Sequence, residues 1–313
     1  MAPEYALMHN AAMSQIPEWN DLRVFLMVAR LGTISLAGER LGIEHSTVSR
    51  RIGRLEEMLG AILFDRRRSG YTLTDAGRRL VPNAEKMEAA LLEAIEQSLD
   101  QAEVIEGTVR VGTPEAFGIH VLAPSLAPLR ELHPGLHIEL IAQPQFPNLA
   151  TREVEILVTL EPPKIGRYKV SKLAQVEYFL YCSPSYRATH PPIRELSDVA
   201  HHEFVDYVHD GWVSERYRIL EELTPHPRRS FTAISVLAQR AAAAAGLGLV
   251  LLTPYVARQV NDLVCVFPNQ TLITRDLWIA APEDLLKIRC YRFVWDHIRH
   301  LIEQHPELFR RPS

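Results

Sequence analysis

Residues Ile34 to Gly60 read ISLAGERLGIEHSTVSRRIGRLEEMLG, which has the pattern of two short helices joined by a tight turn. We expect Ser35 to cap the first helix and Gly42 to end it, because a glycine often follows the last helical residue. The second helix has one apolar stripe, formed by Val48, Ile52, Leu55 and Leu59. These residues recur at the period of a helix, so the stripe predicts a buried face. The segment is typical of a helix-turn-helix, whose second helix can enter a DNA major groove.

The other side of the second helix carries hydroxyl and guanidinium groups. The candidate DNA-contacting residues are Ser46, Thr47, Ser49, Arg50, Arg51 and Arg54 in this helix, together with Ser35 in the first helix. We expect those early in the helix to reach base edges and Arg54 to lie nearer the DNA backbone. A solvated basic face is the alternative, since runs of charge usually meet water.

A basic hairpin is expected directly after these helices. Residues Leu63 to Leu73 have apolar ends around an Arg-rich tip with a Ser-Gly pair, which predicts two short strands and a turn. The tip residues Arg66, Arg67 and Arg68 are candidates for contacts with flanking phosphates. A hairpin in this position is typical of the wing of a winged helix-turn-helix.

The charge of the chain is uneven. Residues Ser46 to Arg79 hold eight arginines and four acidic residues, a local balance of +4, whereas the whole chain carries −4. The remainder therefore carries −8, which indicates a basic nucleic-acid-binding module on a mildly acidic body.

A long helix is expected from Asp75 to about Gln101, with Thr74 as its cap and Pro82 as a candidate kink. Its apolar stripe consists of Leu80, Ala84, Met87, Leu91, Ala94 and Ser98, broadened by Leu92, Ile95 and Leu99. Such a long stripe favours pairing with a second copy of the helix. Packing of the helix on its own body is the alternative.

After Gly107 the pattern changes to strands that alternate with helices, which predicts a parallel or mixed sheet with helices on both faces. The candidate strands are Thr108–Val111, Leu136–Ile141, Ile156–Leu160, Tyr178–Cys182, Glu203–Tyr207, Arg229–Ala233, Leu247–Leu252 and Leu277–Ala281.

The run from Trp19 through Gly77 resembles the amino-terminal domain of LysR-type transcriptional regulators. The resemblance rests on the order and spacing of DLRVFLMVARLGTIS, LAGERLGIEHSTVSRRIGRLEEMLG, LFDRR and LTDAG, and it extends more weakly to about Gln304. It implies an all-α winged helix-turn-helix DNA-binding domain with a long linker helix, followed by a two-lobed α/β effector domain like that of periplasmic binding proteins. Glu44-His45 departs from the Ser-Gln of many relatives.

The implied domains follow the chain in order. They are a disordered extension over residues 1–17, the DNA-binding domain over 18–77, the linker helix over 75–101 and the effector domain over 107–313. Lobe I would comprise residues 107–163 and 268–313, and lobe II residues 164–267. We expect the chain to cross between the lobes near Glu161 to Gly166 and Phe267 to Thr274.

Topology and resemblance together place a small-molecule effector between the lobes, where strands end and helices begin. The candidate effector-binding residues are Thr113, Pro114, Glu115, Gln143, Gln145, Thr159, Thr232 and Ile234. Each has an alternative role as a cap or turn residue. Helix amino ends near Pro114 and Thr232 favour a metabolite that carries a carboxylate, whereas an ionised Glu115 would repel one.

Signs of an enzyme are absent from the sequence. It has no Gly-rich phosphate loop, nucleophile elbow or His-rich metal pattern, so we expect no catalytic residues, no cofactor and no metal. The three cysteines, Cys182, Cys265 and Cys290, are widely spaced, and we expect reduced buried thiols, with a redox-sensing pair as the alternative. No apolar run is long enough to span a bilayer and no secretory signal opens the chain, so we expect a cytoplasmic protein without membrane contact.

These features favour a ligand-responsive regulator over the alternatives of a solute-binding protein or an enzyme built on the two lobes. The partners that the resemblance implies are double-stranded promoter DNA, a small-molecule effector, further copies of the chain in a homodimer or homotetramer, and RNA polymerase.

Overall fold

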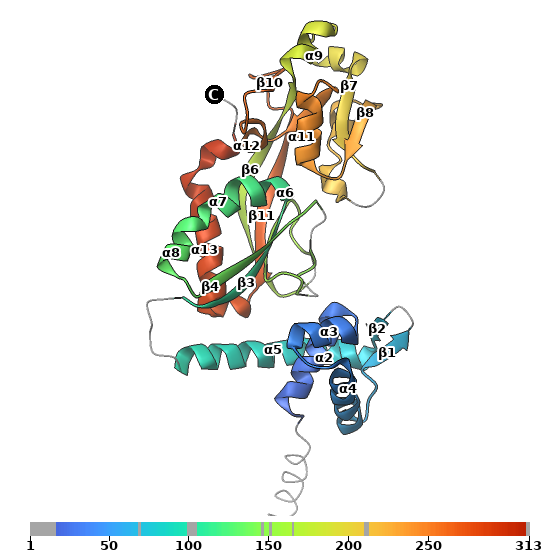
Figure 1. Ribbon diagram of the computed structural model, residues 1–313, viewed down its shortest axis with the longest axis vertical. Helices are drawn as coiled ribbons and strands as arrows, with labels where there is room; N and C mark the ends of the chain where they lie inside the picture. The colour runs from blue at the N-terminus through green and yellow to red at the C-terminus, as the bar shows by residue number, and fades with distance from the viewer. Residues whose placement is uncertain are drawn as a thin grey trace, which may run out of the picture. The chain divides into compact units, whose positions relative to one another are not determined.

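The computed structural model describes residues 17–67, 70–98, 105–144, 147–149, 152–164, 166–209 and 213–310. The chain forms two compact units, the first containing the elements up to α5 and the second the later ones (Figure 1). The expected extension over residues 1–17, apart from Pro17, lies outside the described residues, as do Arg68 and Gln145.

The first unit is a winged helix-turn-helix. Its elements are α2 (Trp19–Leu31), α3 (Ile34–Leu41), α4 (His45–Leu59), β1 (Phe64–Arg67), β2 (Gly70–Leu73) and α5 (Asp75–Ser98). Its core contains Phe25, Ile52 and Phe64, all almost fully buried. Strands β1 and β2 pair antiparallel, so the predicted hairpin is confirmed.

Glycines allow the close approach of α3 and α4. Gly42 ends α3 in the left-handed region, with φ of 66°, where a side chain would be strained. A Cβ on Gly38 would lie 2.7 Å from the carbonyl oxygen of Ile43, so a larger residue would push the turn away from α3.

Two local predictions for this unit are wrong. Thr33, not Ser35, caps α3, because α3 begins at Ile34 and the Leu36 N–H donates to Thr33 Oγ1 over 3.3 Å. Leu59 is 41% exposed, because α4 ends there and its last turn extends beyond the core that buries Leu55.

Helix α5 runs without interruption from Asp75 to Ser98, although Pro82 lies inside it. Thr74 caps it as predicted, since the Gly77 N–H donates to Thr74 Oγ1 over 3.1 Å. The first half of its apolar stripe, including Ala84, packs on the core of the first unit.

The second unit is α/β, as predicted. Its strands are β3 (Gly107–Thr113), β4 (Leu136–Ala142), β5 (Ile156–Thr159), β6 (Tyr168–Cys182), β7 (Glu203–Tyr207), β8 (Arg228–Ala233), β9 (Leu249–Leu252), β10 (Val264–Cys265) and β11 (Ile273–Pro282). Its α-helices are α6 (Glu115–Phe117), α7 (Ala123–Ser125), α8 (Ala127–Leu132), α9 (Pro184–Thr189), α10 (Leu220–Leu223), α11 (Val236–Ala244), α12 (Pro254–Ala257) and α13 (Arg289–Gln304). The π-helix η1 (Gly118–Leu122) joins α6 to α7, and the 3-10 turns are η2 (Leu196–His201), η3 (Glu215–Tyr217), η4 (Leu285–Lys287) and η5 (Pro306–Leu308).

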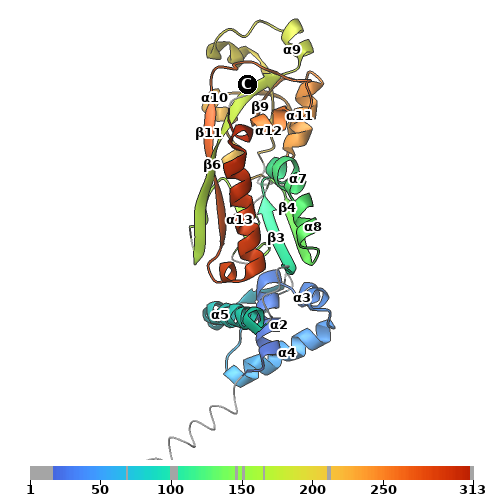
Figure 2. The same ribbon diagram turned by 90° about the vertical axis from the view of Figure 1, so that its left-hand side faces the viewer.

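Within the described residues the strands form one mixed sheet in the order β4-β3-β5-β11-β6-β9-β7-β8, with β10 paired to β6. Strand β3 is parallel to β4 and β5, and β7 is parallel to β8 and β9. We call the strands on the β4 side of β6 the first lobe and those on the β8 side the second lobe. The long strand β6 joins the two lobes (Figure 2).

Strand β6 begins at Tyr168, earlier than the expected start at Tyr178. Its pairing changes from β11 to β9 at Tyr178 and Phe179, so the first crossing lies inside a strand, whereas a loop near residues 161–166 was expected. Its first half is rich in Lys, Ser and Gln and lacks the apolar pattern of a buried strand, but β11 supplies backbone partners along it.

The core of the second unit contains Trp295 on α13 and Phe179 on β6, both almost fully buried. No helix in the described parts of the chain combines the length and apolar character needed to cross a membrane.

Candidate DNA interface and ligand cavity

Helix α4 has two chemically different faces. Val48, Ile52 and Leu55 are almost fully buried against the rest of the first unit. Ser46 and Arg50, by contrast, are exposed near the amino end of the helix. The buried side anchors α4, so the Ser46 hydroxyl and the Arg50 guanidinium remain available to a partner surface.

Three further hydroxyl residues predicted to contact DNA lie close by in sequence. Thr47 and Ser49 are half-buried at the sides of α4, and Ser35 is exposed at the start of α3. The structure thus brings Ser46 and Arg50 to the accessible side of α4 and leaves Thr47 and Ser49 only partly accessible.

Arg51 and Arg54 are held by a carboxylate of α2. Asp21 is fully buried, and its two oxygens accept from Arg51 Nη1 at 3.2 Å and from Arg54 Nε at 2.6 Å. Arg54 Nη2 also donates to Glu18 over 2.7 Å. The hydrogen bond with Asp21, followed by that with Glu18, raises the pKa of Arg54 above its usual value. These bonds attach α4 to α2 and restrict the orientation of the helix.

The wing is attached to α4 by another carboxylate. Glu56 Oε1 accepts from the Leu63 N–H at 2.8 Å, and Glu56 Oε2 pairs with Arg66 at 3.3 Å. The Arg66 guanidinium also lies 5.8 Å from the centre of the Tyr71 ring. Arg67 is exposed on β1, so its guanidinium is accessible to a phosphate.

The second unit contains a small cavity between the lobes, with a volume of about 30 Å³. It lies where β3, β5, β7 and β9 end, which is where open α/β sheets bind ligands. Four tyrosines line it: Tyr178, Tyr207, Tyr217 and Tyr255. Burial raises the pKa of Tyr255 to about 12 and those of the other three above their ordinary value, so all four phenols are neutral at physiological pH.

Glu115 connects the two lobes beside this cavity. It begins α6 in the first lobe, and its carboxylate accepts from Ser235 Oγ and from the Val236 N–H, each at 2.9 Å. Ser235 caps α11 in the second lobe through the Ala238 N–H. The chain's own carboxylate therefore occupies the amino end of α11, a position that favours anions.

The predicted effector residues lie in different surroundings. Pro114 and Glu115 line the cavity. Thr113 and Thr159 are buried, and the Thr159 hydroxyl donates to the Glu161 carbonyl over 3.0 Å. Gln143 is half-buried, and Thr232 and Ile234 are exposed. Among the described candidates, therefore, only Pro114 and Glu115 line the cavity.

The tyrosines and the residues after β9, including Thr253 and Tyr255, were not among the expected effector-binding residues. Tyr207 ends β7, and Thr253 follows β9, so the rule that selected Thr113 could also have found them. Tyr178 and Tyr217 gave no such signal, because one lies inside a strand and the other in a 3-10 turn.

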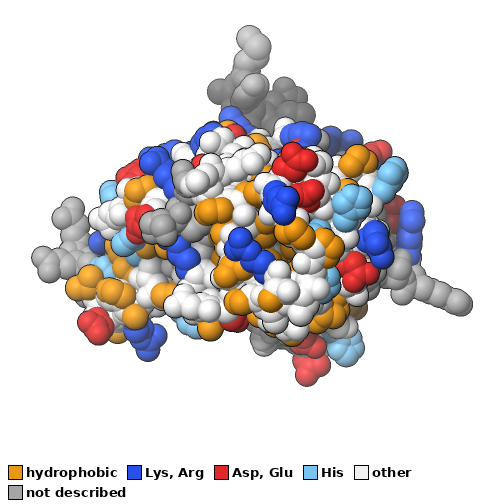
Figure 3. All heavy atoms as spheres, turned by 90° about the horizontal axis from the view of Figure 1, so that it is seen from above, with side chains coloured by type: hydrophobic (Ala, Val, Ile, Leu, Met, Phe, Trp, Pro, Cys, Tyr) orange, Lys and Arg blue, Asp and Glu red, His pale blue; other side chains and the backbone are white. Residues whose placement is uncertain are grey.

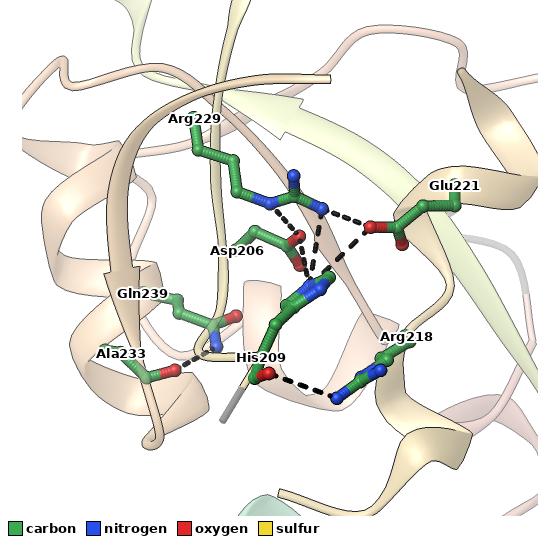
Figure 4. A network of polar contacts seen from close by, with 7 residues as sticks. All are labelled: Asp206, His209, Arg218, Glu221, Arg229, Ala233 and Gln239. Carbon is green, nitrogen blue, oxygen red and sulfur yellow. Dashed lines mark hydrogen bonds and ion pairs between the residues drawn. The ribbon is translucent and has the colours of Figure 1, made fainter. Parts of the chain in front are cut away.

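A second polar cluster surrounds Arg229 in the second lobe (Figure 4). Asp206, His209 and Glu221 have ligand atoms close enough together to hold a metal ion. Arg229 Nε, however, donates to Asp206 over 2.9 Å, and its Nη2 contacts both Glu221 and His209. The guanidinium already supplies the positive charge that these acids require.

A DNA-binding fold with an exposed polar helix, joined to two lobes that enclose a cavity, defines a ligand-responsive DNA-binding regulator. Comparisons with known proteins agree with this class. Residues 19–78 match the family described as bacterial regulatory helix-turn-helix protein, lysR family, and residues 102–302 match the LysR substrate binding domain. The chain belongs to the LysR family: it is a DNA-binding transcriptional regulator with an effector-binding domain, and not an enzyme.

Individual relatives are similar over most of their length. The chain is 26% identical to the HTH-type transcriptional regulator CrgA of Neisseria meningitidis, over 78% of this chain and 81% of that protein. It is 28% identical to the HTH-type transcriptional regulator PtxR of Pseudomonas aeruginosa, over 90% of this chain and 92% of that protein. A full-length OxyR variant from Pseudomonas aeruginosa has the same fold, with a TM-score of 0.68 at 20% identity over 91% of this chain and 98% of that one.

Proposed function

We propose that the chain recognises promoter DNA through the amino end of α4 and that the wing binds flanking phosphates. The proposal rests on the difference between the polar residues of α4 that are held inside the unit and those that are exposed. Asp21 holds Arg51 and Arg54 against α2, whereas Ser46 and Arg50 are exposed on the accessible side. Base edges would meet Ser46, Thr47, Ser49 and Arg50, while Arg51 and Arg54 position the helix near the backbone.

Surface charge supports this location. The face drawn in Figure 3 carries basic and acidic side chains next to one another, with apolar ones between them. A surface that gathers phosphates needs an excess of one sign, which in this sequence occurs around α4 and the wing.

Two substitutions in the full-length protein separate base reading from phosphate binding. Arg50→Ala should lower affinity for genomic fragments selected by the wild-type protein more than for a random duplex of equal length, because a good base contact is worth about 1–3 kcal/mol of discrimination. Arg67→Ala should lower the affinity for both duplexes alike. It should also reduce the slope of log K against log salt concentration by about one, because one phosphate contact is lost. Arg187→Ala is the matched control, since it removes an exposed arginine from α9 in the second unit.

Affinity is measured by fluorescence anisotropy over a series of salt concentrations. If Arg50→Ala lowers the affinity for both duplexes equally, Arg50 contacts phosphate and does not read bases. Unchanged binding for both Arg50→Ala and Arg67→Ala would exclude α4 and the wing as the interface.

We further propose that the effector binds in the cavity between the lobes and that the lobes part to admit it. Ligand pockets are usually about 300–1,000 Å³, far larger than the cavity of about 30 Å³ seen here. A carboxylate effector, the expectation from helix amino ends, would have to replace Glu115 at α11.

Self-association is proposed to occur through the second half of α5. Met87, Leu91, Leu92 and Ile95 are 36–50% exposed there, and they continue the helical stripe that begins in the core. Burying such a stripe against its copy would give a homodimer. We also propose that the dimers can pair into a homotetramer, that the protein contacts RNA polymerase and that it is located in the cytoplasm.

A further inference from the structure

The amino end of α11 is already filled by the carboxylate of Glu115. Helix α11 spans nine residues, and its Val236 N–H and the hydroxyl of its cap Ser235 both donate to Glu115. An effector carboxylate would normally find its best site at such a helix end. In this chain the site is taken by a residue that belongs to the other lobe.

Glu115 is also the one charged side chain among the described residues that line the cavity. The nearby Arg240 is paired with Asp262 at 2.6 Å, and its Nε donates to the Val256 carbonyl. The cavity therefore has a negative group and no basic lining residue in the described part of the chain to balance a second anion.

The remaining wall is aromatic. Tyr207 and Tyr217 lie with ring centroids 5.1 Å apart, and Tyr178 and Tyr255 complete the group. The faces of aromatic rings attract cations, and cages of aromatic side chains bind organic ammonium groups. A carboxylate beside such a cage adds direct attraction between opposite charges. An anion placed here would meet the charge of Glu115, with no basic lining residue in the described part of the chain to offset it.

We propose that the effector carries an ammonium group, which enters this cavity and is recognised by Glu115 and the tyrosines. The inference rests on the proposed function of the cavity as the effector site. Glu115 is then the specificity-determining residue that selects amines over carboxylates.

The size of the cavity defines a minimal probe. A water molecule needs about 10–15 Å³ of such space, so a cavity of about 30 Å³ holds roughly two non-hydrogen atoms. Protonated methylamine has that size. A ligand of two non-hydrogen atoms can bind no more tightly than a Kd on the order of several millimolar, so the probe is used at about 50 mM.

Thermal unfolding of the full-length protein is compared in methylammonium chloride, sodium acetate and sodium chloride at equal ionic strength. Methylammonium should raise the Tm of the second unit by up to about 3 °C relative to sodium chloride, and acetate should not. Glu115→Gln keeps the length of the side chain but removes its charge, so it should abolish the methylammonium shift. Glu131→Gln on α8 is the control, because it removes an exposed carboxylate that does not line the cavity.

Glu115→Asp tests whether Glu115→Gln fails only because it disturbs the fold. It keeps the charge, so it should retain part of the methylammonium shift. A larger shift with acetate than with methylammonium, or a methylammonium shift that survives Glu115→Gln, would overturn the proposal. Equal Tm in all three salts would overturn it too. DNA affinity, measured without any probe, tests the proposed DNA interface separately, so failure of one proposal leaves the other standing.

Discussion

The bond between α2 and α4 can be tested by replacing the buried acid at its centre. Asp21→Asn removes the charge that holds Arg51 and Arg54 but preserves the size of the side chain. The asparagine oxygen can still accept one hydrogen bond, and its amide group faces a guanidinium that has no acceptor to offer. We expect α4 to lose attachment while the rest of the fold remains intact.

The size of the loss follows from the geometry. Asp21 accepts two hydrogen bonds from charged donors, at 3.2 and 2.6 Å, and each such bond is worth about 1.5–3 kcal/mol. The side chains of Arg51 and Arg54 are 29% and 45% exposed, so water replaces part of what they lose. Arg54 also keeps Glu18. The net destabilisation of the first unit should be about 2 kcal/mol, which corresponds to about a 30-fold change in an equilibrium constant.

Hydrogen–deuterium exchange of the full-length protein measures this locally. The protected amides of α4 should exchange about 30-fold faster in Asp21→Asn, because their opening free energy falls by that amount. Asp75→Asn is the control: Asp75 is 82% exposed and pairs only locally with Arg78, so its loss should change exchange by no more than about twofold. Unchanged protection of α4 in Asp21→Asn would refute the view that the buried carboxylate holds the helix, and equal acceleration in the second unit would show a global effect.

Two further outcomes are expected. Leu91→Asp should convert a dimer to a monomer in sedimentation experiments, because a charge buried between two α5 helices costs several kcal/mol. The control Lys86→Asp changes an exposed residue and should leave the dimer intact. A dimeric Leu91→Asp variant would place the interface elsewhere. Burial lowers the pKa of His202, which is 2% exposed, below its ordinary value of 6.5. The folded state therefore prefers the neutral ring, and its stability should be complete above pH 6.5 and fall as the pH drops through the lowered pKa. The Tm of His202→Phe should depend less on pH between 7.5 and 5; an identical pH dependence in both proteins would contradict this origin.

Features that depend on near neighbours in the chain were predictable. The stripe of Val48, Ile52 and Leu55 and the turn at Gly42 identified the helix-turn-helix, because helix period and glycine conformation are local properties. Thr74 was recognised as a cap for the same reason. The wing followed from apolar ends around an Arg-rich tip with a Ser-Gly pair, and the order of motifs indicated the family.

Strand β6 shows where local reasoning stops. Its first half, from Tyr168, has no clear apolar pattern, and it is a strand because β11, distant in sequence, pairs along it. The place where the chain crosses between lobes depends on this pairing and not on the residues near 161–166.

The partners of charged side chains were decided by tertiary structure alone. The sequence shows Arg51 and Arg54 on the polar side of a helix, but only the packing of α2 brings Asp21 beneath them. Likewise, Glu115 could be seen to oppose an anion, but its bonds to Ser235 and Val236 join segments far apart in the chain. Helix period and turn chemistry are set within a few residues, whereas the partner of a carboxylate is set by whichever elements the hydrophobic core brings together.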